Sequence, residues 1–215
     1  VDDVKDSDAL VDAVLASDAD AKLLDGLCEL LTSIQEFAGV VKVRKAILAE
    51  HEREFGAESK EAGEALFELG EAYQDLGDAT KQRAALERAL PIYEREHGSD
   101  GAKVANVLSV LGNAYSALGD YAKQRDMQER ALAIKERAYG RDHPEVAQTL
   151  MNLGIAYGAL GDQAKKRDIL ERALAIKERA YGHDHPEVAQ TLMNLGNAYM
   201  GLGDYTKQRD LQERS

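Results

Sequence analysis

The chain has 215 residues, of which 44% are hydrophobic and 31% are charged, and its formal net charge is −12. The apolar content is sufficient for a packed interior and excludes an intrinsically disordered chain. The acidic balance disfavours nucleic acid and anionic membrane surfaces as partners, because both require clustered Lys and Arg. Much of the negative charge lies at the N-terminus, where seven aspartates accompany only Lys5 in the first twenty residues.

No apolar stretch approaches the roughly 20 residues that a membrane span requires, and the start of the chain is too acidic for a signal peptide. We therefore expect a soluble, cytoplasmic protein. The single cysteine, Cys28, cannot form an internal disulfide, and without partner thiols it offers no zinc site. Because the chain begins at Val1 and stops at Ser215, part-way through an expected helix, we expect it to be a fragment of something longer.

The predicted elements are helices throughout, because strong helix formers dominate every segment and only three prolines interrupt them. In chain order, a short covering helix opened by Ser7 is expected at 7–16, followed by weaker helical patterns at about 19–35 and 38–55. Four helix pairs follow, at 60–76 and 79–97, 102–118 and 121–139, 144–160 and 163–181, and 186–202 and 205–214.

A five-residue phrase that recurs every 42 residues explains this pairing. The phrase begins at Leu69, Leu111, Leu153 and Leu195, and each time glycine stands second and tyrosine fifth. A fixed period of this length indicates stacked supersecondary units, each of which completes the apolar interior of the next. The sequence therefore predicts an all-α fold, a right-handed α-solenoid of antiparallel helix pairs.

The same period divides the chain into units. We assign residues 1–18 to an acidic segment with the covering helix and residues 19–59 to a degenerate repeat. In this repeat the phrase has decayed to Leu27-Cys28, as is common for terminal repeats, one face of which meets solvent. Four repeats occupy residues 60–101, 102–143, 144–185 and 186–215, and the last of them has an incomplete second helix.

Local signals within a unit support the helix boundaries. Pro144 suits a first helical position after Asp142 and His143 as candidate caps, while Gly161 suits a left-handed helix end and Asp162 the next cap. The glycine of the phrase costs about 1 kcal/mol inside a helix relative to alanine, so its repetition predicts a close helix crossing. The tyrosines of the phrase are expected to be structural and mostly buried, with hydroxyls near water or a backbone partner.

The phrase resembles the tetratricopeptide repeat family, whose helix-turn-helix unit carries the pattern Leu-Gly-x-x-Tyr and a later alanine on the second helix. The usual unit has 34 residues. The 42-residue period with the linker Tyr-Gly-x-Asp-His-Pro-Glu-Val-Ala, at 139–147 and 181–189, is similar to the kinesin light chain type. The resemblance covers about residues 19–214 and implies peptide or protein binding in a groove formed by the first helices.

An internal comparison suggests where binding occurs. Residues 129–162 and 171–204 differ at four positions, which are Arg141/His183, Ile155/Asn197, Gly158/Met200 and Ala159/Gly201. Three of the four fall at i, i+3 and i+4 on the first helix and so share one stripe. Residues fixed by packing must be the same in each unit whereas ligand-facing residues can differ, so this stripe is a candidate recognition surface. The alternative is an exposed face whose sequence varies because it has no function.

The candidate groove also includes polar residues one or two turns before the stripe, whose amides both donate and accept hydrogen bonds. The predicted groove residues are Glu71, Gln74, Asn106, Asn113, Ser116, Gln148, Asn152, Ile155, Gln190, Asn194, Asn197 and Met200. This surface is polar and neutral and becomes acidic toward the first repeat. We therefore expect a protein or extended peptide of neutral to basic character as the partner.

No residues indicate catalysis or a cofactor. Carboxylates follow solvated helix faces, no glycine-rich phosphate loop joins a strand to a helix, and no third metal ligand recurs beside His183 and His185. We predict a non-catalytic protein-protein interaction scaffold without catalytic, cofactor or metal residues. The alternatives are a regulatory or sensor segment of a larger enzyme or signalling NTPase, and a repeat module that self-associates end to end.

Overall fold

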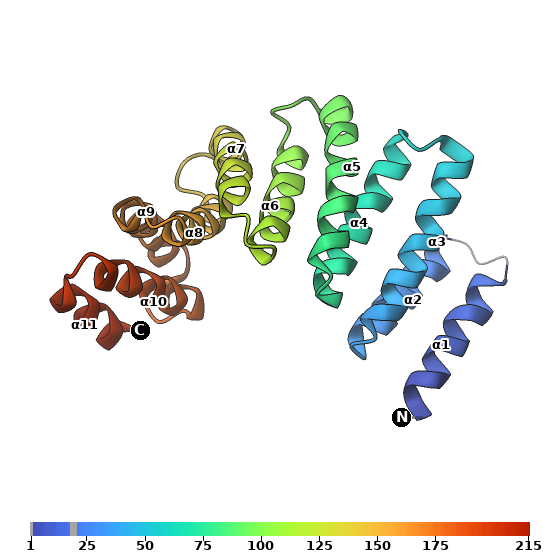
Figure 1. Ribbon diagram of the computed structural model, residues 1–215, viewed down its shortest axis with the longest axis horizontal. Coiled ribbons are helices and arrows are strands. Elements are labelled where there is room, and N and C mark those ends of the chain that lie inside the picture. Colours follow the sequence, from blue (N-terminus) through green and yellow to red (C-terminus); the bar gives the residue numbers. More distant parts are fainter. Residues whose placement is uncertain (1, 18–20) are drawn as a thin grey trace. The chain divides into compact units, whose positions relative to one another are not determined.

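The computed structural model describes residues 2–17 and 21–215, which fall into two compact units, residues 1–99 and 100–215. Unit 1 contains α1 (Asp2–Leu15), α2 (Ala21–Ser33), α3 (Phe37–Phe55), α4 (Lys60–Leu76) and α5 (Ala79–His97). Unit 2 contains α6 (Ala102–Ala117), α7 (Tyr121–Tyr139), α8 (Pro144–Ala159), α9 (Gln163–Tyr181), α10 (Pro186–Gly201) and α11 (Tyr205–Arg214). In each unit, helices that follow one another in the chain pack side by side (Figure 1). The described residues contain no strand, which confirms the predicted all-α stack of helix pairs.

The helix boundaries lie close to the expected ones except at the N-terminus. The covering helix expected at 7–16 extends over Asp2–Leu15 instead, so its start is earlier than the Ser7 cap. The second pattern, expected at about 19–35, is a helix over Ala21–Ser33. The expected boundary between residues 18 and 19 lies outside the described residues, as do Asp18 and Asp20. The division into repeats remains a prediction.

The turn between the two helices of a pair is built as the sequence predicts. Gly161 has a φ of 86°, a left-handed conformation that glycine adopts without steric cost. The Asp162 carboxylate then accepts a hydrogen bond from the Lys165 backbone N–H at 3.0 Å and so caps α9. Equivalent aspartates, Asp78, Asp120 and Asp204, cap α5, α7 and α11.

Histidine caps α8 and α10. His143 Nδ1 accepts a hydrogen bond from the Glu145 backbone N–H at 3.2 Å, and Pro144 occupies the first turn of α8. The His143 ring also stacks on Tyr139, with ring centroids 5.0 Å apart. This geometry resolves the two candidate caps in favour of His143, because its side chain satisfies an otherwise unpaired N–H of the helix start.

The repeated glycine and tyrosine contribute to packing within and between helix pairs. A Cβ atom on Gly154 would lie 2.9 Å from Leu170 Cδ2, so α8 and α9 cross too closely for any side chain there. Tyr157 and Tyr199 are buried as expected. Their hydroxyl partners differ from the expected water or backbone groups, because they donate to the carboxylates of Glu129 and Glu171 on the preceding second helices. Each tyrosine therefore links its helix pair to the preceding one.

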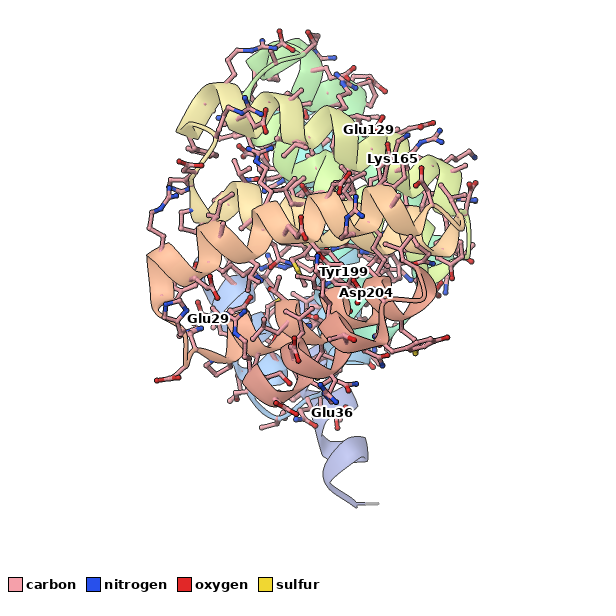
Figure 2. The ribbon with its side chains drawn as sticks, turned by 90° about the vertical axis from the view of Figure 1, so that its left-hand side faces the viewer. Glu29, Glu36, Glu129, Lys165, Tyr199 and Asp204 are labelled. Atoms are coloured by element: carbon pink, nitrogen blue, oxygen red, sulfur yellow. The ribbon has the colours of Figure 1, made fainter. Side chains whose placement is uncertain are left out.

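A lysine lies over each of these tyrosine rings. Lys165 Nζ is 4.8 Å from the ring centroid of Tyr157, and Lys207 Nζ is at the same distance from Tyr199. Lys165 on α9 and Glu129 on α7 are near neighbours around Tyr157 (Figure 2). The hydrogen bond to Glu129 raises the pKa of the Tyr157 hydroxyl to about 12, so this phenol stays protonated at neutral pH.

Candidate peptide-binding surface

The twelve predicted groove residues lie on the first helices of the pairs and none of them is buried. Glu71 and Gln74 belong to α4 of unit 1, and the other ten belong to α6, α8 and α10 of unit 2. The surface in unit 2 is therefore described by itself. The exposed or partly exposed positions are Asn106, Asn113, Ser116, Gln148, Asn152, Ile155, Gln190, Asn194, Asn197 and Met200.

Three of these amides form a chain of hydrogen bonds across α6 and α8. Gln148 Nε2 donates to Asn152 Oδ1 at 3.4 Å, and Asn152 Nδ2 donates to Asn113 Oδ1 at 3.1 Å. The buried Gln124 side chain on α7 also donates, to the Asn152 backbone carbonyl at 3.1 Å. This part of the predicted groove is thus already internally bonded, and the bond between Asn152 and Asn113 links α8 to α6.

The equivalent amides on α10 are not bonded in this way. Asn194 stands 42 residues after Asn152, and the residue 42 positions after Asn113 is Ile155, which has no hydrogen-bonding side chain. No side-chain hydrogen bond of Asn194, Asn197 or Gln190 is found among the described residues. Gln190 and Asn197 are exposed and Asn194 is half-buried, and Ile155 is 43% exposed.

The remaining stripe residue, Met200, adds an apolar group to this surface. Met200 is 47% exposed, whereas its equivalent Gly158 is covered by the stem of Lys166, whose Cδ would lie 2.7 Å from an added Cβ. Burial lowers the pKa of Lys166. The α8–α10 surface, which we define as Ile155, Gln190, Asn194, Asn197 and Met200, thus combines open amides with two exposed apolar side chains.

The α4 residues of the predicted groove have different surroundings. Gln74 Oε1 accepts a hydrogen bond from Gln82 Nε2 at 3.0 Å. Glu71 lines a cavity of about 430 Å³ between α2, α3 and α4. Glu71 is exposed, but partial loss of its hydration beside the cavity raises its pKa, and the nearby charges of Glu68 and Asp75 raise the pKa further. The expected acidic character toward the first repeat is therefore present within unit 1.

Sequence reasoning missed most of this cavity. Its walls include Glu29 and Arg44 of the degenerate repeat, where the Leu-Gly phrase is lost. The signal that could have found them is the register, because Cys28 stands 42 residues before Gly70 and Glu29 stands 42 residues before Glu71. Cys28 itself is buried, and burial raises the pKa of its thiol, which disfavours the reactive thiolate.

The histidines have structural surroundings. His185 caps α10 through Nδ1, which accepts from the Glu187 backbone N–H at 3.2 Å, and His183 Nδ1 lies 3.2 Å from Glu178 Oε1. Among the residues that the structure describes, no group of three or more His, Cys, Asp or Glu side chains is placed to hold a metal ion. None of the described helices combines the length and the apolar character needed to cross a bilayer.

Comparison with known proteins identifies the repeat. The tetratricopeptide repeat model matches residues 61–137, 123–177 and 167–215. No curated protein matches the chain. A putative kinesin light chain from Podosopora anserina with nearly identical TPR-like repeats has a similar structure, with 21% identity, a TM-score of 0.78, and 90% of this chain and 92% of that chain covered.

Two further solved structures share the fold. BtubC (BKLC) from P. vanneervenii is 22% identical, with a TM-score of 0.77 and 98% of this chain and 84% of that chain covered. A Rap protein complexed with Competence and Sporulation Factor is 19% identical, with a TM-score of 0.66 and 89% of this chain and 51% of that chain covered. The repeated phrase, the helix pairs and the family match agree, and the chain belongs to the tetratricopeptide repeat family.

Proposed function

We propose that the chain is a non-catalytic scaffold that binds a protein or an extended peptide on the first helices of its repeats, in the cytoplasm. The tetratricopeptide repeat fold supports this, as does its likeness to a Rap protein solved with Competence and Sporulation Factor. Within unit 2 the α8–α10 surface is the binding site. An extended segment of neutral to basic character suits it, because this surface carries amides and apolar groups but no cation.

The observation that carries this assignment is the unpaired amide of Asn194. Asn152, which stands 42 residues before Asn194, donates its side-chain N–H to Asn113. The residue that corresponds to Asn113 for Asn194 is Ile155, which has no acceptor in its side chain. A peptide backbone laid across α10 would supply the missing acceptor and donor to Asn194 and Asn197. Exposed Met200 would pack against an apolar side chain of the same segment.

The test is a binding measurement on the full chain. An array of capped, extended peptides is probed with the labelled protein, and the peptides that bind are titrated by fluorescence anisotropy. The double variant Asn194→Ala and Asn197→Ala should weaken binding more than tenfold, while Arg209→Ala, at an exposed site on α11, should leave it unchanged. Equal affinity of the double variant and the parent for the peptides would show that the binding site does not lie on this surface.

A second candidate function, self-association, is favoured by one comparison. Met193 on α10 is 53% exposed, whereas its equivalent Met151 is 3% exposed within a cluster that includes Val188 and Leu192. The uncovered face of α10 repeats a face of α8 that other helices of the unit cover, so a second copy could dock there. Light scattering over a concentration series should then show mass growth, and a constant monomer mass would refute it.

A further inference from the structure

The cavity between α2, α3 and α4 in unit 1 is lined by positions that correspond, through the 42-residue period, to positions of the surface proposed for binding in unit 2. Glu71 and Asp75 occupy the stripe positions of α4, and Glu29 and Ser33 occupy the positions 42 residues earlier on α2. All four residues line the cavity, whose volume is about 430 Å³. Two first helices therefore present their variable positions to one open groove. We refer to this space as the acidic groove.

The floor of the acidic groove is apolar and its rim is negative. Cys28, Val40 and Ala72 form the floor, and Cys28 and Val40 are 3% and 7% exposed. Carboxylates of Glu29 and Asp75 stand at the rim from opposite helices. Such a combination suits a side chain that has a hydrocarbon stem and a charged end, as lysine and arginine have.

The cation within the groove is already paired. Arg44 Nη1 lies 2.7 Å from Asp25 Oδ1 and 2.9 Å from Glu68 Oε2, and its side chain is only 19% exposed. These two carboxylates balance its charge. The carboxylates of Glu29 and Glu71 have no hydrogen bond or ion pair with any described residue, and the same holds for Asp75. The groove thus has an uncompensated negative charge.

We propose that the acidic groove receives one lysine or arginine side chain from a partner peptide, with its aliphatic stem on Cys28, Val40 and Ala72 and its cationic end between Glu71 and Asp75. This inference rests on the proposed function and names the chemistry of the partner. A bare metal ion suits the groove less, because the carboxylates are distributed around an apolar floor and no three described ligands converge. Charge complementarity of this kind increases association rate and selects basic over neutral segments.

The test uses the full chain and two matched probes. The first is an N-acetylated, C-amidated nonapeptide of alanine, serine and glycine with one central arginine, and the second replaces that arginine with citrulline, which has the same shape and no charge. Backbone amide shifts of the isotopically labelled protein are followed by NMR. The arginine peptide should shift amides on α2 and α4, and the citrulline peptide should bind at least tenfold more weakly.

Isosteric variants assign the binding to the carboxylates. Glu71→Gln with Asp75→Asn should weaken the arginine peptide about tenfold, and Glu29→Gln alone should weaken it by a smaller factor. Arg209→Ala, at an exposed site on α11, should change neither value. Equal binding of the arginine and citrulline peptides would overturn the inference. Shifts confined to α8 and α10 and abolished by Asn194→Ala would also overturn it, and in that case the function proposed for unit 2 would stand.

Discussion

The glycine of the repeated phrase provides an internal test of the packing. A Cβ on Gly154 would lie 2.9 Å from Leu170 Cδ2 and 3.0 Å from Leu170 Cγ, and Leu170 is fully buried. A Cβ on Gly196, the same position one repeat later, would meet nothing closer than the Gln208 carbonyl oxygen at 3.7 Å, an ordinary contact. Alanine should therefore have opposite effects at two positions of the same phrase.

The magnitudes follow from two effects. Replacing a helical glycine by alanine contributes about 1 kcal/mol through backbone entropy at either position. At Gly154 the added methyl group also overpacks the crossing of α8 and α9, which costs about 1–3 kcal/mol because the fully buried Leu170 side chain must shift to admit it. We expect Gly154→Ala to lower the free energy of unfolding by up to about 2 kcal/mol and Gly196→Ala to raise it by about 1 kcal/mol. The difference between the two isolates the steric cost.

Urea and thermal unfolding followed by far-UV circular dichroism measure both variants against the parent chain. The expected gain of Gly196→Ala corresponds to a rise in Tm of about 2–4 °C for a domain of this size. Both substitutions lie in unit 2, so they report on the same structure. A stability change of the same sign and size at the two positions would refute the reasoning, since it would mean that the crossing of α8 and α9 tolerates a methyl group.

Three further predictions concern a cap, the ion pair of a buried lysine and a pH effect. His185→Ala should destabilise unit 2 by about 1 kcal/mol in urea unfolding because α10 loses its cap. Glu187→Ala should lower the free energy of unfolding by about 3 kcal/mol, because it leaves the Lys177 ammonium unpaired on a side chain that is only 3% exposed. Lys177→Met removes that charge and should lower the free energy of unfolding by about 1 kcal/mol or less. Partial loss of hydration and neighbouring carboxylates raise the pKa of Glu71 above 4.5. Its contribution to stability is complete below that pH and is lost as the pH rises through the raised value, so Glu71→Gln should increase Tm at pH 7 and much less at pH 4.

Each of these has a matched control. His185→Asn keeps a capping acceptor and should restore most of the lost stability, so equal losses for alanine and asparagine would contradict the cap assignment. A larger cost for Lys177→Met than for Glu187→Ala would contradict the account of the ion pair. For Glu71→Gln, a Tm increase that is the same at pH 4 and pH 7 would show that charge is not its cause.

Much of the fold could be predicted because the phrase is periodic and each of its residues has a local role. Gly161, Asp162 and Pro144 mark helix ends through backbone conformation and capping, which depend on only a few neighbouring residues. The start of α1 could not be placed in this way, because Asp2, Asp3, Asp6 and Ser7 are all residue types that cap helices and no glycine or proline marks one of them as the boundary.

The candidate site could be predicted only in part, because its properties depend on contacts between helices. Asn152 is hydrogen-bonded because Asn113 lies on the preceding first helix. Asn194 is not, because the residue 39 positions before it is Ile155. The acidic groove was missed because it depends on Arg44 lying between two carboxylates from other helices.

The contacts between neighbouring repeats use the same residues at the same offset. Arg172 pairs with Glu136 at 2.5 Å and Arg214 pairs with Glu178 at 2.7 Å, and in both cases 36 residues separate the partners. A duplicated copy of 42 residues would therefore arrive with its arginine and its glutamate already placed for both neighbours. Such an array can lengthen or shorten by unequal recombination without a second mutation, so lineages of this chain should differ in repeat number more readily than in repeat length.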